Sequence, residues 1–248
     1  MKPPDILEKY ARYFRKTHAP RLSKKDLLAL YQAFFRAFNF GNEKYSILHA
    51  SAAMTKSGKC ILFGDDGNMT EGKTLLSLAL ASVSGSYVAD EYVLYDCLDN
   101  RIFGNTSIPI NLKGQTASFI AKQYGIFYNS NALIFADDYY SITHDCNVEL
   151  MVIPYMNSPK TEIINPSITE QKEIIKATYY GHMTKFLNPE YDHVSVLVSE
   201  LEKEIDLRKS LQECREILFP WPIIKVMIKD VEDIPAVIEE LNKYLLSK

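Results

Sequence analysis

A strand–loop–helix segment between residues 59 and 81 constrains the fold of this chain more than any other feature. The run Gly67-Asn68-Met69-Thr70-Glu71-Gly72-Lys73-Thr74 fits the pattern GxxxxGK[ST] of a phosphate-binding loop, or P-loop. Residues 59–64 before the run predict a short buried strand, and residues 75–81 after it predict a helix. In this arrangement the backbone N–H groups of the loop point at phosphates on the helix N-terminus. The segment therefore predicts an α/β fold with a nucleotide site.

The last two residues of the loop have the most specific chemistry. Lys73 would reach the outer phosphates, and the Thr74 hydroxyl would complete a magnesium shell. The other candidate contacts for the phosphate chain are Gly67, Asn68, Met69, Thr70, Glu71 and Gly72. The alternative is a glycine-rich turn with a chance lysine.

Negative charge around the loop leaves two interpretations of the site open. Asp65, Asp66 and Glu71 are carboxylates close to the expected phosphates, and like charges repel. Either the site depends strongly on Mg²⁺, or the loop has diverged from tight nucleotide binding.

Composition fits one soluble domain and excludes some partner classes. A chain of 248 residues, 47% hydrophobic and 24% charged, suits a single domain over 1–248, with 1–42 as an N-terminal helical segment packed on the core. The net charge of -3 gives no basic footprint for nucleic acid. We expect no membrane segment, because no apolar run is long enough to span a bilayer. We also expect a cytoplasmic protein, because the N-terminus lacks the apolar core of a signal peptide. The four cysteines lie far apart without metal-ligand spacing, which indicates reduced thiols.

Periodicity and turn signals predict the remaining elements. Capping signals are clearest at Ser167 and Glu170, and Pro235 lies in the first turn of a final helix. The expected helices cover 5–18, 24–39, 167–187, 199–217 and a segment from 233. The expected strands cover 47–54, 87–95 and 222–228, together with most of 116–165, where 148–154 is the clearest.

Three short stretches together resemble a known family. They are Leu48-His49-Ala50-Ser51, the P-loop, and Val88-Ala89-Asp90-Glu91. In this order they resemble the kinase domain of the HPr kinase/phosphorylase family, which is related in fold to phosphoenolpyruvate carboxykinase. The run Phe219-Pro220-Trp221-Pro222-Ile223-Ile224-Lys225-Val226 also resembles the end of the short HPr-kinase-like proteins. The resemblance implies a mixed sheet with a P-loop and flanking helices.

The resemblance also implies roles for individual residues. ATP and Mg²⁺ would be bound by the P-loop, with Lys73 acting in catalysis. Asp90 would take the proton from the acceptor hydroxyl, and His49 would lie beside Asp90 and tune it. Glu91 stands where the family usually has a second aspartate near the metal. A carboxylate next to a histidine suits proton transfer near neutral pH.

The implied activity is an ATP- and Mg²⁺-dependent kinase. It would transfer the γ-phosphoryl group to a hydroxyl, most naturally of Ser or Thr in a small protein or peptide. The sequence lacks the family's Glu-x-Arg-Gly-x-Gly stretch, so the resemblance implies neither phosphorolysis nor HPr as substrate. The bifunctional relatives form rings, so the resemblance allows a homo-oligomer, but the sequence does not specify the oligomeric state.

Other interpretations remain open from the sequence. The chain could phosphorylate a small metabolite, or it could be a non-catalytic nucleotide-binding regulatory or interaction protein. Asp90-Glu91 could be an exposed turn and His49 a hydrogen-bonded core histidine. His144-Asp145 could form a second acid–base pair or lie on the surface, and Asp137-Asp138 could join a metal or form a turn.

Overall fold

A computed structural model describes residues 45–66, 72–91, 93–96, 98–104, 110, 112, 114–128, 134–184 and 219–247. The expected helices at 5–18, 24–39 and 199–217 lie outside these ranges, as do P-loop residues 67–71. Within the described ranges, no helix combines the length and apolar character needed to cross a membrane.

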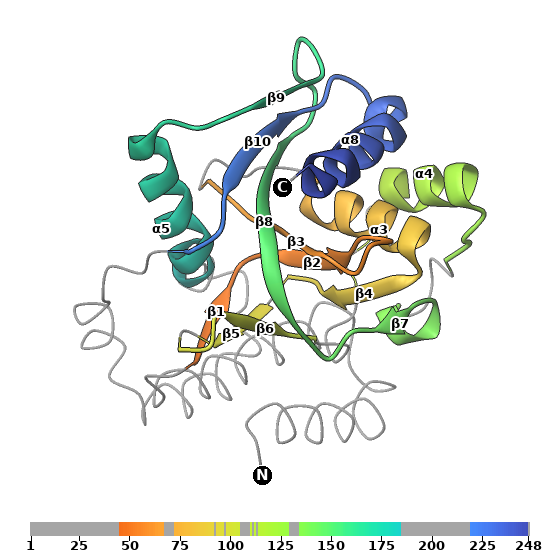
Figure 1. The fold of residues 1–248 in the computed structure, drawn as a ribbon. Helices are drawn as coiled ribbons and strands as arrows, with labels where there is room; N and C mark the ends of the chain where they lie inside the picture. Colours follow the sequence, from red (N-terminus) through yellow and green to blue (C-terminus); the bar gives the residue numbers. More distant parts are fainter. Residues whose placement is uncertain are drawn as a thin grey trace.

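A mixed β-sheet flanked by helices forms the described part of the chain, so the predicted α/β fold class is confirmed (Figure 1). Its strands are β1 (Tyr45–Leu48), β2 (Ser51–Met54), β3 (Cys60–Phe63), β4 (Ser86–Ala89), β5 (Val93–Asp96), β6 (Arg101–Phe103), β7 (Ser141–Ile142), β8 (Asp145–Tyr155), β9 (Glu162–Ile164) and β10 (Ile223–Met227). The spatial order is β1-β5-β6-β8-β3-β2-β4-β7, and β10 pairs with both β8 and β9.

The long strand β8 belongs to two parts of the sheet. Its first residues pair antiparallel with β6, which continues the small antiparallel group of β1, β5 and β6. Its middle pairs in parallel with β3, and its last residues, 151–155, pair in parallel with β10. In Figure 1, β8 runs as one curved green strand past both groups. The two groups therefore share one continuous backbone.

Helices cover both faces of the larger group of strands. They are α3 (Lys73–Ser84), α4 (Gly114–Tyr124), α5 (Ile168–Thr184) and α8 (Ile234–Leu246), with short 3₁₀ turns η2 (Ala136–Asp138) and η5 (Val231–Asp233). α3 packs against β2, α4 and α8, whereas α5 lies on the opposite face and contacts β1 (Figure 1). Each face encloses its own buried apolar cluster, and the side chains of β3 alternate between the two.

Local sequence explains where several helices begin and end. Glu170 accepts hydrogen bonds from both the backbone N–H and the hydroxyl of Ser167, which confirms the predicted capping box at the start of α5. Gly85 ends α3 in the left-handed conformation, with φ 79°. Pro235 lies in the first turn of α8, as expected.

Three sequence expectations are corrected by the structure. The expected strand over 87–95 is two strands, β4 and β5, because the chain leaves the sheet after Ala89. Residues 114–124 form α4 rather than strand, because Phe119, Ile120 and Tyr124 follow helical spacing and pack on one apolar cluster. The expected strand over 47–54 is two strands, β1 and β2, which pair with different neighbours. The strand is interrupted at His49 and Ala50, and this interruption brings the histidine to the site described below.

Candidate functional site

Several loops meet at one edge of the sheet because the strands beside them run in the same direction. β3 is parallel to β8, and β4 is parallel to β3 because each pairs antiparallel with β2. The carboxyl ends of β3, β4 and β8 therefore lie at the same edge, which is where α/β proteins bind ligands. α3 begins there, and His49 precedes the start of β2, where Ser51 pairs with Phe63 at the end of β3.

The end of the P-loop is shaped by backbone conformation. Gly72 has φ 113°, which a residue with a side chain rarely adopts, and Met156 packs against it. A Cβ on Gly72 would lie 3.1 Å from Met156 Cγ. The next residue, Lys73, starts α3. The glycine thus fixes how the chain enters the helix and where Lys73 emerges.

Lys73 is held by an acidic residue from the other side of the loop. Its Nζ donates a hydrogen bond to Asp65 Oδ2 at 2.6 Å. Both side chains are well shielded, with 13% and 7% of their surfaces exposed. Shielding from water strengthens such a pair relative to a surface ion pair. Asp65 is thus a direct partner of Lys73 and not only a nearby negative charge.

Thr74 joins the P-loop to the end of β4. Its hydroxyl donates to the Asp90 carboxylate, at 3.0 Å from Oδ1. Asp90 is buried, with 4% of its surface exposed. Burial, and then the charge of Glu91, raise the pKa of Asp90 to about 7, against the lowering effects of the Thr74 hydrogen bond and the Lys73 charge. The interpretation of Asp90-Glu91 as a solvent-facing turn does not fit a carboxyl with this burial.

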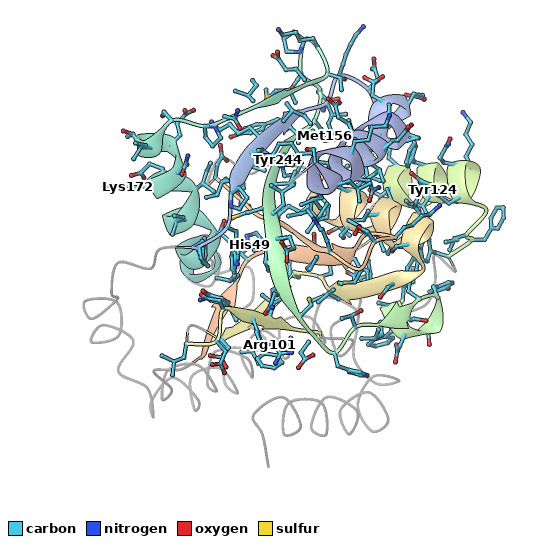
Figure 2. The ribbon with its side chains drawn as sticks, viewed as in Figure 1. His49, Arg101, Tyr124, Met156, Lys172 and Tyr244 are labelled. Carbon is cyan, nitrogen blue, oxygen red and sulfur yellow. The ribbon has the colours of Figure 1, made fainter. Side chains whose placement is uncertain are left out.

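His49 lies between two carboxylates of the site. Its Nδ1 is 3.4 Å from Asp65 Oδ2, and its Nε2 is 3.5 Å from Glu91 Oε1. The ring is 3% exposed, and Figure 2 shows it in the interior, whereas Lys172 and Arg101 lie toward the outside. Glu91 has the left-handed φ of 60°, an uncommon conformation for a residue with a long side chain. The histidine thus contacts Glu91, the residue that follows Asp90. Its role in tuning Asp90 stays a prediction.

Helix α5 anchors both His49 and Asp65 through one residue. The Thr178 hydroxyl accepts a hydrogen bond from the Asp65 N–H at 3.2 Å and donates to the Asp65 carbonyl at 2.9 Å. The Thr178 carbonyl accepts from the His49 N–H at 2.8 Å. Thr178 is fully buried. The backbone on either side of the site is therefore fixed by a residue far away in sequence.

Gly64 lets the chain pass close to β8 before it reaches Asp65. Its N–H donates to the Val152 carbonyl at 2.9 Å. A Cβ at this position would lie 2.2 Å from Met151 Cε and 2.9 Å from Thr178 Oγ1. Contacts this short force neighbouring side chains to move.

Gly64→Ala is therefore expected to lower the free energy of unfolding by about 1–3 kcal/mol, as overpacking in a filled core does. Urea denaturation followed by circular dichroism measures the change. Gly114→Ala is the control, because a Cβ there meets nothing within 4 Å. It should leave stability unchanged or slightly raised, since alanine is the better helix former. Equal stability of Gly64→Ala and the wild type would contradict the tight packing described for this turn.

The remaining sequence candidates lie outside this cluster. Asp145 pairs with Arg101 at 2.8 Å, and His144 is exposed, as expected for a surface position. Asp137 and Asp138 are exposed in η2. The P-loop candidates Gly67, Asn68, Met69, Thr70 and Glu71 lie outside the described residues.

A magnesium ion fits the oxygen donors of this site. Mg²⁺ prefers oxygen ligands and is usually held by one or two protein groups together with phosphates and water. The Thr74 hydroxyl donates its hydrogen to Asp90, so its oxygen lone pairs remain for a cation. Within the described ranges, no three His, Cys, Asp or Glu side chains form a cluster able to hold a metal by themselves. Thr74 and Glu91 are thus the protein groups that would share the ion with a substrate's phosphates, and Asp90 would lie beside them.

Comparisons with known proteins find distant structural similarity. No protein-family model and no curated protein matches the sequence. Among solved structures, the chain is similar to the HPr(Ser) kinase/phosphatase from Coxiella burnetii, with 15% identity and a TM-score of 0.37. The match covers 82% of this chain and 97% of that one. These values describe a distant structural relationship.

Two contributors to the site were not predicted as such from the sequence. Thr178 lies 113 residues from Asp65, and a single threonine in a predicted helix carries no signal of such a contact. Tyr155, at the end of β8, donates a hydrogen bond to Asp66. Tyr155 follows the clearest predicted strand at its carboxyl end, and this position could have indicated that the residue lies near a binding site. Burial and this hydrogen bond raise the pKa of the Tyr155 hydroxyl, so it stays protonated near neutral pH.

Proposed function

We propose that this chain is an ATP- and Mg²⁺-dependent phosphotransferase of the HPr-kinase-like type, acting on a hydroxyl of a small protein or peptide. The observation that carries the proposal is the hydrogen bond from Thr74 to Asp90 at 3.0 Å. This bond supports the proposal because it joins the last residue of the P-loop pattern to a buried carboxyl whose pKa is about 7, near the value that suits a general base at neutral pH. Lys73 lies beside Thr74 at the start of the same helix.

These residues would divide the work of phosphoryl transfer. Lys73 would offset the charge of the outer phosphate oxygens, and the Thr74 hydroxyl would bind the metal. When bound, Mg²⁺ would neutralise phosphate charge and hold the phosphates in place. Asp90, as carboxylate, would accept the proton of the acceptor hydroxyl. The new bond joins the acceptor oxygen to the γ-phosphorus, the bond from that phosphorus to the bridging oxygen breaks, and ADP leaves.

His49 and Glu91 would act around this centre. Glu91 is proposed as a further oxygen group near the metal, and its charge contributes to the raised pKa of Asp90. His49 contacts both Glu91 and Asp65, so it would hold these two carboxylates in position. We therefore treat His49 as a positioning residue of the proposed site.

The proposal is tested first by calorimetric titration with MgATP, using the wild type and Thr74→Val. The wild type should bind MgATP, and Thr74→Val should bind it roughly tenfold more weakly, because a metal-ligating hydroxyl is lost. Thr74→Ser keeps the hydroxyl and should restore affinity. The control is Thr143→Val, which removes a hydroxyl that bonds Ser86 at 2.7 Å near the opposite end of β4.

The outcomes of this titration separate the proposal from its alternative. Absence of MgATP binding by folded wild type would exclude the phosphotransferase. Binding without label transfer from [γ-³²P]ATP to any fraction of a cell extract would favour a non-catalytic nucleotide-binding protein. The close pairing of Lys73 with Asp65 is the observation that favours this alternative, since a lysine held by the protein is less available to phosphates. Transfer to the macromolecular fraction supports a protein or peptide acceptor over a metabolite.

A further inference from the structure

The strongest unassigned feature of the site is the contact between Lys73 and Asp65. The 2.6 Å separation and the low exposure of both side chains make it a shielded ion pair. A lysine in a nucleotide site is expected to meet phosphate oxygens, yet here a protein carboxylate already occupies it. Incoming phosphates must therefore share or displace Asp65.

Asp65 is fixed in place, whereas Lys73 can move. Thr178 holds both the N–H and the carbonyl of Asp65, and the preceding Gly64 is bonded to Val152. His49 also lies beside the same Asp65 oxygen that accepts from Lys73. The lysine ammonium, in contrast, stands at the end of four rotatable bonds. The carboxylate charge is therefore a permanent part of the site, and the lysine is the group that turns toward a ligand.

The charges around Lys73 make the form of the nucleotide important. Besides Asp65, the carboxylates Asp90 and Glu91 follow β4 at the same edge of the sheet. A metal-free triphosphate meets these carboxylates without a counter-ion. Complexation with magnesium lowers the negative charge that the ligand brings, and repulsion at short range falls accordingly.

We propose that Asp65 is a specificity-determining residue that makes the site discriminate against metal-free nucleotide, by acting as the resident counter-ion of Lys73. The inference rests on the proposed function, because it assumes that the site takes a nucleoside triphosphate. Asp65 competes with unneutralised phosphates for the lysine and repels them. A magnesium-complexed nucleotide carries less negative charge, so Asp65 repels it less and its phosphates compete more effectively with Asp65 for Lys73.

Binding of ATP in excess Mg²⁺ and in excess EDTA tests this inference without any measurement of turnover. For Asp65→Asn, affinity for metal-free ATP should rise roughly tenfold or more, and affinity for MgATP should change by less than about threefold. Asp65→Glu keeps the charge and should keep the wild-type discrimination. Asp66→Asn is the matched control: it removes the same charge one residue away, where the side chain bonds Tyr155, and should leave the ratio of the two affinities near the wild-type value.

The results distinguish failure of this inference from failure of the proposed function. If the wild type binds MgATP but Asp65→Asn does not tighten metal-free ATP, Asp65 is not the discriminating residue and the nucleotide site stands. Equal tightening by Asp66→Asn would show general electrostatics and also overturn the inference. If the wild type binds neither form, both proposals fall. If Asp65→Asn does not fold, the affinities of the wild type for MgATP and for metal-free ATP provide the test. We then expect metal-free ATP to bind at least tenfold more weakly, and equal affinities would overturn the inference.

Discussion

Asp90→Asn is expected to lower phosphate transfer by roughly 10²–10⁴-fold while leaving MgATP binding largely intact, the range typical of losing a general base. Asparagine keeps the shape of the side chain and can still accept the Thr74 hydrogen bond, but it cannot take a proton from the acceptor. Label transfer from [γ-³²P]ATP to separated macromolecular and small-molecule fractions of an extract measures the loss. Calorimetry on the same variant measures binding. Full transfer by Asp90→Asn would exclude Asp90 as the base.

The same variant should be more stable than the wild type at alkaline pH. The pKa of Asp90 is raised in the folded state to about 7 from an ordinary value of 3.8, so folding favours the protonated form. As pH rises from about 4 to about 7, the unfolded chain loses this proton more readily and the folded state is penalised. Asparagine has no such penalty. We expect Asp90→Asn to gain about 1–3 kcal/mol in free energy of unfolding at about pH 8 and little at about pH 4.

A buried aspartate elsewhere provides the control for both measurements. Asp96 is 2% exposed and accepts backbone hydrogen bonds from Leu98 and Asp99 at 3.0 and 3.1 Å in the turn after β5. Asp96→Asn removes a buried carboxylate without touching the proposed centre. It should neither abolish transfer nor stabilise the protein at alkaline pH. A gain of stability in Asp96→Asn equal to that of Asp90→Asn would point to net charge rather than to the environment of Asp90.

The second large effect is expected for Lys73→Met, which should weaken MgATP binding by roughly 100-fold or more, because the lysine proposed to meet the phosphates is lost. This variant also leaves the Asp65 charge without its lysine partner in a shielded position. Breaking such a pair on one side destabilises a protein by up to about 3–5 kcal/mol. Binding must therefore be compared between folded samples.

The double variant Asp65→Asn/Lys73→Met separates folding from binding. With both charges removed, stability should recover toward the wild type, while MgATP binding should remain lost. Lys59→Met is the lysine control, since Lys59 precedes β3 at its opposite end and donates to the Leu245 carbonyl at 2.5 Å. Strong MgATP binding by the double variant would mean that Lys73 contributes little to the nucleotide site.

Local signals predicted the elements that carry the site, and distant contacts decided its geometry. The P-loop pattern predicted the helix that begins at Lys73, whereas the strand expected to run through Asp90 ends at Ala89. Helix α4 was missed because turn residues and aromatic residues around it favoured strand, while its apolar face is short. The contact between Lys73 and Asp65 spans a loop of the chain, so residue spacing alone does not specify it.

The part of the site that sequence could not supply comes from tertiary pairing. His49 meets Asp65 and Glu91 only because β1 and β2 separate at the histidine and join different neighbours in the sheet. The raised pKa of Asp90 likewise depends on burial, which a strand-end position in a sequence does not specify. Residue identity therefore indicated the chemistry, and packing determined which groups touch.

The hydrogen bonds of Thr178 couple the geometry of the site to the position of helix α5 on the sheet. One residue restrains the backbone before β2 and the backbone after β3, so the position of α5 contributes to the separation of His49 and Asp65. The helix and the two loops are thus linked by hydrogen bonds to the same residue. A shift of α5 along its axis would move both anchors together and would alter the partner of Lys73 without any contact to the nucleotide.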